Sequence, residues 1–336
     1  MTNEKGSQER DLKPLVTVGI PVFNGEETLS SCIESLRAQT YTNLEILVFD
    51  NCSVDETKKI VDLAKNSDNR IKYFRSEKNL GAVHSFNSLL NLASGDFFMW
   101  AAADDLRSPR YIEQALLHLQ ANPEASLSAP VTEGYIEGFK DPIYRVSVPD
   151  FTVRKDFIRR TYMYLTNFPD TAIYGLFRIE KVKETSGLER SIATDAAFLF
   201  DIALRGAVVS NDSQILIMNR RKKWNTTSDD YRVFFGDGDF PRFLPPFMQL
   251  LSDRCKRVWK IPESFARRLL VILLIFVCET RRILFILGIK LFKRILNRRL
   301  FTRLILKIHW RFIHKPNYEI LDEEVYKKRI IVSKYI

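Results

Sequence analysis

Gly95–Pro109, with the sequence GDFFMWAAADDLRSP, is the stretch that decides the fold. Its apolar run from Phe97 to Ala103 is too short for a typical helix, and it stops at two adjacent carboxylates, Asp104 and Asp105. A Ser-Pro pair then marks the start of a helix. The pattern predicts a buried strand that delivers both carboxylates to its end.

The adjacent acids allow two interpretations. Neighbouring carboxylates repel each other, and a divalent metal ion between them relieves the repulsion. Alternatively, Asp104 or Asp105 lies in a solvated turn and caps the following helix. The preceding segments favour a binding site.

Three similar units come before this one. Strand-like runs at Leu15–Val22, Leu44–Phe49 and Ile71–Phe74 are each followed by a polar turn and a helical pattern. Strands that alternate with helices through short connections predict right-handed βαβ units. The expected fold is therefore α/β, with a parallel sheet and helices on both faces.

Two capping-box patterns predict where the first two helices begin. Asn24 is followed three residues later by Glu27, and Ser53 is followed three residues later by Glu56. The first of these helices is expected to run to about Ala38.

Successive predicted strands deliver Asn or Asp to one edge of the sheet, where ligands bind in folds of this kind. These residues are Asn24, Asp50, Asn79 and the pair Asp104 and Asp105. The chain has no GxGxxG after its first strand and no GxxxxGK[ST], so the glycine-rich phosphate loops are excluded. A carboxylate-bound Mg²⁺ or Mn²⁺ that neutralises a substrate diphosphate is the remaining common device.

Length and composition predict a globular protein with appendages. The chain has 336 residues, of which 46% are hydrophobic. Its polar start lacks the apolar core of a signal peptide, so a cytoplasmic location is expected. The four cysteines show no metal-ligand spacing and are expected to be reduced and mostly structural.

The ordered set of motifs resembles the family 2 glycosyltransferases of the GT-A fold. The motifs are VGIPVFNGE (18–26), VFDNCSVDET (48–57), NLG (79–81) and AADD (102–105), and the match covers about Leu15–Ser228. The resemblance implies a Rossmann-like, mostly parallel sheet. It also implies metal-assisted transfer of a sugar from a nucleotide-diphosphate donor to a hydroxyl, usually with inversion at the anomeric carbon.

The resemblance also implies roles for individual residues. Pro21, Phe23 and Glu26 would line the nucleotide pocket, and Asp50 would accept a hydrogen bond from the base. The family more often has Tyr at the position of Phe23, which can stack but cannot donate a hydrogen bond. The other donor-binding positions on this side are Asn24, Asn79, Gly81 and Asp104.

The metal motif departs from the common family pattern, Asp-x-Asp-Asp. Ala102 occupies the first position, which leaves Asp104 and Asp105 as the metal-binding pair. A variant with only the adjacent pair also occurs in the family. Which of the two binds the metal and which contacts the ribose stays open.

Asp195 is the candidate catalytic base. A periodic helix begins just after it and stops at Gly206, so Asp195 is also a candidate helix cap with lowered proton affinity. In the family, an Asp ahead of a helix ending in Leu-Arg-Gly corresponds to the base that takes the proton of the acceptor hydroxyl. Both roles can coexist in one residue.

A strand-like run at Gln214–Met218 leads into a basic turn. Related enzymes often carry a His in this turn, and none is present here. Arg220 and Arg221 can contact the donor diphosphate instead, because cationic donors suit phosphate. A solvated basic turn is the alternative.

The net charge of +10 is concentrated near the C-terminus. Thirteen Lys or Arg residues and one acid, Glu279, lie between Phe265 and Lys315. The apolar run Leu269–Cys278 is far shorter than the roughly 20 residues that a bilayer span needs, so a transmembrane helix is not expected.

Basic residues then recur every four positions among apolar side chains, at Arg299, Arg303, Lys307 and Arg311. This pattern predicts a cationic amphipathic helix on an anionic membrane surface, to which each basic residue adds about 1 kcal/mol. A protein partner, including a second copy of the chain, is the alternative, and nucleic acid is disfavoured by the abundance of Leu, Ile and Phe. A peripheral position on the inner face of the membrane would suit a glycan or lipid-linked acceptor, as in lipopolysaccharide or surface polysaccharide synthesis.

The expected organisation has five parts. They are a polar tail (1–14), a GT-A domain (15–228) with a nucleotide-sugar-binding half (15–110) and an acceptor half (111–228), a linker or cover (229–264), basic amphipathic membrane-associating helices (265–315) and a C-terminal tail (316–336). A non-catalytic sugar-nucleotide-binding or membrane-binding protein on the same scaffold is the competing interpretation, motivated by Ala102 and the missing His.

Overall fold

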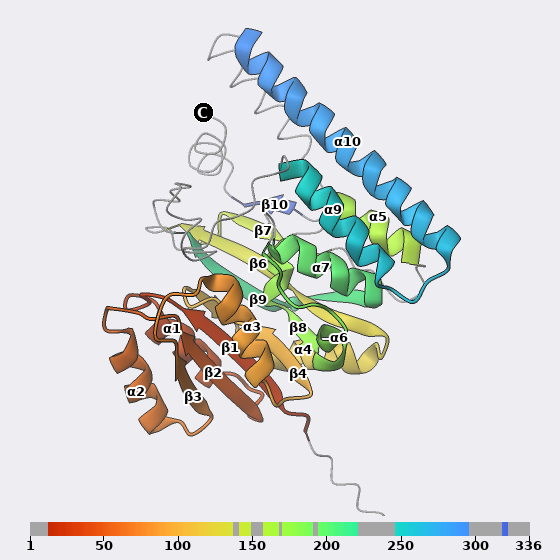
Figure 1. Ribbon diagram of the computed structural model, residues 1–336. Coiled ribbons are helices and arrows are strands. Elements are labelled where there is room, and N and C mark those ends of the chain that lie inside the picture. The colour runs from red at the N-terminus through yellow and green to blue at the C-terminus, as the bar shows by residue number, and fades with distance from the viewer. Residues whose placement is uncertain are drawn as a thin grey trace, which may run out of the picture.

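One mixed sheet with helices on both sides forms the body of the protein, as a computed structural model shows (Figure 1). The structure describes residues 13–136, 141–148, 157–167, 170–190, 194–220, 246–295 and 318–321. Within this part of the chain the strand order is β10-β7-β6-β8-β4-β1-β2-β3, with β9 pairing to both β5 and β6. The α/β fold class predicted from the sequence is confirmed.

The N-terminal half alternates strand and helix, as the hydrophobic runs predict. The four strands pair in parallel; β1, β2 and β4 are almost entirely buried, whereas the edge strand β3 is only partly buried. They are β1 (Val16–Val22), β2 (Leu44–Asp50), β3 (Ile71–Arg75) and β4 (Phe97–Trp100), and the helices between them are α1 (Leu29–Arg37), α2 (Thr57–Ser67) and α3 (Ala82–Leu92).

Strand β1 lies between β2 and β4 and sets the register of both. Val22 lies opposite Asp50, and Gly19 lies opposite Trp100. The carboxyl ends of β1, β2 and β4 therefore meet at one edge of the sheet, where the sequence places its polar turns.

The two predicted capping boxes are wrong. Helix α1 begins at Leu29 and α2 at Thr57, several residues after Asn24 and Ser53. Asn24 instead adopts a left-handed backbone conformation with φ of 53°, and its side-chain oxygen accepts the N–H of Val54 at 3.0 Å. The Ser53 hydroxyl accepts the N–H of Asn24 at 2.9 Å, so these side chains join two turns instead of capping helices.

The C-terminal half makes the sheet mixed. Antiparallel pairing joins β4 to β8, β6 to β8 and β5 to β9, whereas β6 and β9 are parallel. The strands are β5 (Asp105–Arg107), β6 (Ala125–Ile136), β7 (Tyr144–Val146), β8 (Leu176–Arg178), β9 (Ala207–Arg220) and β10 (Tyr318–Ile320). The helices up to β9 are α4 (Tyr111–Ala121), α5 (Phe157–Asn167), the 3-10 helix η1 (Asp170–Tyr174), α6 (Ile179–Lys183) and α7 (Thr194–Arg205).

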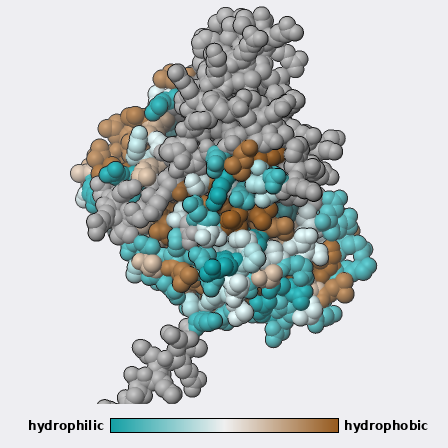
Figure 2. Space-filling model, turned by 180° about the vertical axis from the view of Figure 1, so that it is seen from behind, coloured by the Kyte–Doolittle hydropathy of each residue, from teal (hydrophilic) through white to brown (hydrophobic). Residues whose placement is uncertain are grey.

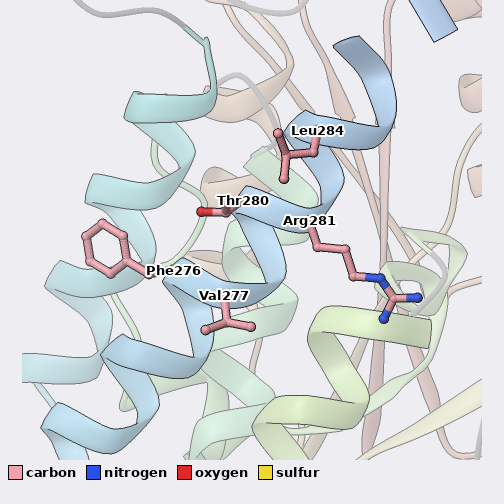
Figure 3. A pocket seen from close by; sticks show the side chains of 5 residues that line it. All are labelled: Phe276, Val277, Thr280, Arg281 and Leu284. Carbon is pink, nitrogen blue, oxygen red and sulfur yellow. The ribbon is translucent and has the colours of Figure 1, made fainter. Parts of the chain in front are cut away.

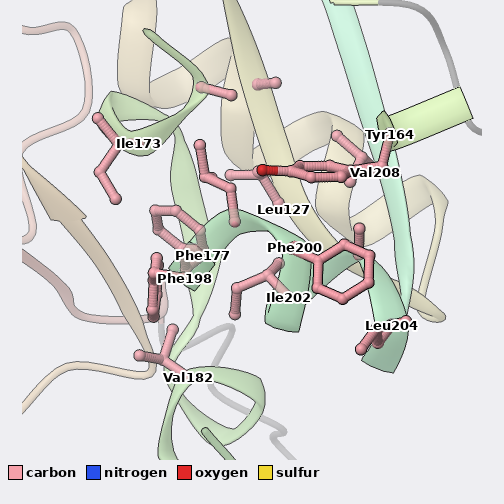
Figure 4. Close-up of a cluster of buried hydrophobic side chains, with 14 of the residues drawn as sticks. Leu127, Tyr164, Ile173, Phe177, Val182, Phe198, Phe200, Ile202, Leu204 and Val208 are labelled. Carbon is pink, nitrogen blue, oxygen red and sulfur yellow. The ribbon is translucent and has the colours of Figure 1, made fainter. Parts of the chain in front are cut away.

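The aromatic core is centred on Trp100, the last residue of β4. Its ring is fully buried, and the ring centroids of Phe98 and Phe198 lie 4.8 and 5.3 Å away. Phe177 and Phe198 also contact each other, and Figure 4 shows both among the buried side chains that α7 packs against the sheet. Strand β4, which ends shortly before the acid pair, is thus packed against α7.

Two C-terminal helices pack on this body, α9 (Pro246–Trp259) and α10 (Phe265–Ile295). Helix α9 lies against α7, and the 31-residue α10 runs along α9 and α5 (Figure 1). The range 229–264, predicted to be a linker or cover, therefore contains a packed helix. The cationic pattern from Arg299 to Arg311 lies outside the described residues.

The described helices include none that is both long enough and apolar enough to cross a bilayer.

Substituting Trp100 tests the aromatic core. Trp100→Ala removes a fully buried ring and should lower the free energy of unfolding by about 3–5 kcal/mol. Urea denaturation measures the change, and Leu117→Ala is the control because Leu117 is 50% exposed and should change stability by about 0.5 kcal/mol or less. Similar losses in the two variants would show that Trp100 is not a centre of packing.

Candidate active site

Side chains connect the turns at the carboxyl edge into one surface. The contacts between Asn24, Ser53 and Val54 join the turn after β1 to the turn after β2. Asn51 makes the next link, because its Nδ2 donates to Asn79 Oδ1 at 2.7 Å and its Oδ1 accepts the N–H of Leu80 at 2.9 Å. Hydrogen bonds thus run across the ends of β1, β2 and β3.

Asn79 also shapes the entry to α3. Its Oδ1 accepts the N–H of Gly81 at 2.9 Å, and Gly81 has a positive φ of 83°, a conformation that glycine adopts without steric cost. The predicted pair Asn79 and Gly81 is therefore brought together in one turn.

Asp50 is fully buried at the end of β2 and is held by three donors. Its Oδ1 accepts the N–H of Ser53 at 2.7 Å, and its Oδ2 accepts the Tyr73 hydroxyl at 2.6 Å and Arg75 Nη1 at 3.4 Å. Burial and the hydrogen bond to Asp50 raise the pKa of Tyr73 to about 12. Each carboxylate oxygen has two lone pairs, so Oδ1 keeps the capacity to accept one further donor.

The other predicted nucleotide-pocket residues lie beside Asp50. Pro21 pairs with Phe49 in the β1–β2 register, and Phe23 follows β1 with 36% of its surface exposed. The Glu26 carboxylate accepts the N–H of Glu56 at 3.2 Å. Phe23 thus offers a partly exposed aromatic ring at this edge, and Glu26 holds the turn after β2.

The acid pair follows β4, and its two members differ in exposure. Asp104 is exposed in a turn, whereas Asp105 is buried and begins β5. Asp105 lies opposite Met218 in the antiparallel pairing of β5 with β9. Strand β9 ends two residues later, at Arg220, so the backbone of Arg220 lies close to the acid pair. The side chain of Arg220 and all of Arg221 lie outside the described residues.

Arg107 is a buried cation close to the acid pair, and the sequence analysis missed it. Its Nη1 donates to the carbonyl of Asp105 at 3.0 Å, and the side chain is only slightly exposed. Nη1 also lies 3.9 Å from Cys32 Sγ, and burial raises the pKa of Cys32 to about 11, which keeps the thiol neutral. The sequence contained one signal that Arg107 lies near the acid pair. Asp105 and Arg107 are two residues apart, and on a strand such residues share a face.

Tyr174, at the end of η1, is a buried phenol whose pKa responds to three of the predicted acids. Burial raises the pKa of its phenol well above the usual range, and the charges of Asp105, Asp104 and Asp195 raise it further. The acids come from segments about 90 residues apart in the chain, after β4 and at the start of α7. The charges of the predicted metal pair and of the predicted base therefore act on the same phenol.

Asp195 lies in the first turn of α7 and is partly buried. Helix α7 begins at Thr194, so Asp195 lies inside the helix and not at the predicted cap position before it. Its Oδ1 accepts the N–H of Ala196 at 2.8 Å, one of the first-turn donors that lack a partner within the helix. Burial raises the pKa of its carboxyl above the ordinary value, although backbone hydrogen bonds oppose the shift. The expected lowering of proton affinity at the helix start is wrong, because desolvation outweighs the favourable N-terminal field.

The residues present fit a site completed by a substrate. Within the described ranges, no three His, Cys, Asp or Glu side chains are grouped closely enough to hold a metal by themselves. Mg²⁺ is commonly bound by one or two carboxylates together with substrate phosphates, and Asp104 and Asp105 provide such a pair.

Solved structures of similar fold are GT-A glycosyltransferases. TarS residues 1–349 from S. aureus, in complex with UDP, gives a TM-score of 0.54 at 16% identity, covering 76% of this chain and 69% of that one. The mannosyltransferase PcManGT from Pyrobaculum calidifontis, in complex with GDP-Man and Mn²⁺, gives a TM-score of 0.50 at 14% identity, covering 90% and 81%. The protein therefore has a GT-A fold, as predicted.

Sequence comparison identifies the family. The pattern of glycosyl transferase family 2 matches residues 17–188, just over half of the 336 residues, and the chain belongs to this family. A Haemophilus influenzae glycosyltransferase is 34% identical over 124 residues, which are 37% of this chain and 38% of that protein. The Escherichia coli enzyme UDP-Glc:alpha-D-GlcNAc-diphosphoundecaprenol beta-1,3-glucosyltransferase WfgD is 36% identical over 109 residues, 32% of this chain and 42% of that protein. The matched segments thus span well under half of these relatives.

Proposed function

We propose that the protein transfers a sugar from a nucleotide-diphosphate donor to an acceptor hydroxyl, with metal assistance and with inversion at the anomeric carbon. The observation that carries the proposal is the position of the acid pair Asp104 and Asp105 directly after β4, at the carboxyl edge of the sheet that β4 shares with β1. The charges of these two acids and of Asp195 all raise the pKa of the buried Tyr174 phenol. Family 2 membership supports it, as do the fold relatives whose structures contain UDP or GDP-Man with Mn²⁺.

The nucleotide is proposed to bind at the ends of β1 to β3. Phe23 stacks on the base beside Pro21, and Asp50, held rigidly by its own donors, accepts a hydrogen bond from a base N–H. The remaining proposed residues frame this pocket through the turns that they connect: Asn24, Glu26, Asn79 and Gly81.

Asp104 and Asp105 are proposed to hold Mn²⁺ or Mg²⁺ together with the donor diphosphate. A bound divalent ion neutralises the diphosphate and stabilises it as a leaving group. Arg220 and Arg221 are proposed to share this charge, because the backbone of β9 ends beside β5.

Asp195 is proposed to act as the general base. Its carboxylate takes the proton of the acceptor hydroxyl while that oxygen attacks the anomeric carbon, and the nucleoside diphosphate leaves from the opposite face with the electron pair of the broken bond. The raised pKa of Asp195 suits this role, since a carboxylate of higher proton affinity accepts a proton more readily.

Calorimetric binding of UDP, GDP, CDP and dTDP, with and without Mn²⁺, tests the donor site. One nucleotide should bind in a metal-dependent manner, and Asp104→Ala and Asp105→Ala should each weaken binding by about tenfold or more. Asp62→Ala, which removes an exposed acid on α2, is the control and should bind as the wild type does.

Two other results would contradict this assignment. Tight binding without metal dependence would move charge neutralisation from the acid pair to the basic turn. If no nucleotide binds, a non-catalytic protein on this scaffold becomes the better interpretation.

Asp195→Asn tests the base. The rate constant kcat should fall by about 10²–10⁴-fold, because proton removal is lost, whereas nucleotide affinity should be unchanged. In the wild type, kcat/KM should fall with decreasing pH through a pKa above the ordinary aspartate value of 3.8, because only the ionised carboxylate is active. Wild-type turnover in Asp195→Asn would reject the assignment.

We further propose that α10 places the protein on an anionic membrane surface. Among its described side chains, α10 exposes seven large apolar ones, each 45–64% accessible: Phe265, Leu269, Leu270, Leu273, Phe276, Val277 and Leu284. Figure 2 shows hydrophobic side chains gathered on the side of the molecule where α10 lies. An apolar helix face with flanking basic residues is typical of helices that bind the interface of a bilayer.

Charge on α10 supports lipid as the occupant of this face. Figure 3 shows Arg281 beside Val277 and Leu284 around a shallow hollow in the helix surface. Glu279, the one acid in the sequence of α10, is turned inward and buried. The outward face therefore carries apolar and basic groups that complement an anionic bilayer, a location that suits a lipid-linked acceptor such as the one in the name of the E. coli relative.

Sedimentation with vesicles containing anionic phosphatidylglycerol tests this surface. The double substitution Leu273→Glu and Val277→Glu should strongly reduce the sedimenting fraction, because charged side chains resist burial among lipid chains. Leu117→Glu, which changes an equally exposed leucine on α4, should sediment as the wild type does. Undiminished sedimentation of the double variant would reject lipid docking by α10, and a change from dimer to monomer would assign the face to a second copy.

A further inference from the structure

A buried arginine on α9 holds two acids that lie on either side of Asp195 in the sequence. Arg257 is 2% exposed, its Nη1 donates to Asp201 Oδ2 at 3.0 Å, and its Nη2 donates to Glu189 Oε2 at 3.0 Å. The two nitrogens belong to one rigid, planar group, so the two acids are held at a fixed separation.

The positions of the two acids in the sequence indicate which part of the protein Arg257 can hold in place. Glu189 lies in the segment that leads into α7, six residues before Asp195, and Asp201 lies on α7, six residues after it. One guanidinium therefore fixes both the approach to α7 and the body of the helix. The first turn, which carries Asp195, lies between these two acids in the sequence.

The contact to α7 is deeply buried and shared. Asp201 is 0% exposed and also pairs with Arg205, one turn later on the same helix. Buried ion pairs contribute little net stability compared with well-packed apolar residues, because both charges lose their hydration. An ion cluster at this position is therefore better explained by a requirement for fixed geometry than by a gain in stability.

A second buried pair on α9 provides an internal comparison. Arg254 lies one turn before Arg257, is equally buried and pairs with Glu279 of α10. This ion pair joins α9 to α10 and not to α7 or the segment before it. Arg254 also contacts α7, because its guanidinium lies 5.7 Å from the centroid of the Phe200 ring. The two arginines thus share burial and contact with α7, but only Arg257 forms ion pairs with the acids on either side of Asp195.

We propose that Arg257 is a positioning residue for glycosyl transfer, acting through Glu189 and Asp201 to hold the start of α7 so that Asp195 stays aligned with the acceptor hydroxyl. Arg257 touches no substrate in this role. The inference rests on the proposed function of Asp195 as the base. A displacement of about 1 Å at a reacting group can lower a rate by about 100-fold, so a small shift of α7 is sufficient to matter.

Arg257→Lys tests the proposal, because lysine keeps the charge but cannot bind both acids in the fixed fork geometry. The assay is release of nucleoside diphosphate from UDP-glucose, UDP-N-acetylglucosamine or GDP-mannose in water, with the donor that the wild type turns over. Arg257→Lys should lower kcat by about 10- to 100-fold and leave the Kd for the nucleotide unchanged. The matched control, Arg254→Lys, should keep kcat within about twofold of the wild-type value.

Glu189→Gln provides a second variant in case Arg257→Lys does not fold. Glu189 has a side chain that is 44% exposed, so its substitution should leave the fold intact while weakening one arm of the contact. Its kcat should fall less than that of Arg257→Lys, again at unchanged nucleotide affinity. An unchanged kcat in Glu189→Gln would contradict the proposal.

A double-mutant cycle with Asp195→Asn separates positioning from a general structural effect. If Arg257 acts through Asp195, adding Arg257→Lys to Asp195→Asn should cause no further loss of kcat. Additive losses, or equal losses in Arg257→Lys and Arg254→Lys, would overturn the proposal. Full turnover in Asp195→Asn alone would overturn the base assignment and this inference together, whereas loss in Asp195→Asn with a normal Arg257→Lys would overturn this inference alone.

Discussion

The parallel pairing of β1 with both β2 and β4 is the constraint on which the site depends. Because parallel strands end at a common edge, the turn after Val22, the side chain of Asp50 and the acids after Trp100 become neighbours. Hydrogen bonds between side chains of successive turns then fix the edge itself, from Asn24 and Ser53 to Asn51 and Asn79. A different strand order would leave the same residues as isolated turn formers.

The sequence predicted the strands and their common edge because both signals are local. Short apolar runs that end at Asn or Asp identify buried strands and the direction in which they leave the sheet. The capping boxes failed because a local motif competed with a contact about 30 residues away: Asn24 Oδ1 accepts the N–H of Val54, and α1 begins only at Leu29. Spacing shows that a side chain can cap a helix, but it does not show which donor it finds in the folded chain.

The parts that could not be predicted depend on burial created by distant segments. Arg254 and Arg257, three residues apart, would be solvated on an isolated helix, and only the packed fold gives them buried acids as partners. The proton affinity of Asp195 was predicted with the wrong sign for the same reason, since its helix start is visible in the sequence and its desolvation is not. Arg107 follows the acid pair at strand spacing, but its burial depends on packing in the folded chain.

The two buried arginines of α9 connect the C-terminal helices to the body of the protein. Arg257 ties α9 inward to α7, and Arg254 ties it outward to α10, so the apolar face proposed to bind lipid and the proposed base are joined through one helix. Removing α10 would take Glu279 away from Arg254 and expose the apolar side chains that α10 covers, such as those packed against the buried Val271 and Ile275, a destabilising change that is independent of any lost membrane contact. Loss of activity after truncation would therefore not distinguish lipid docking from damage to the catalytic body. Substitutions confined to the exposed face of α10 separate the two effects, because they leave both ion pairs intact.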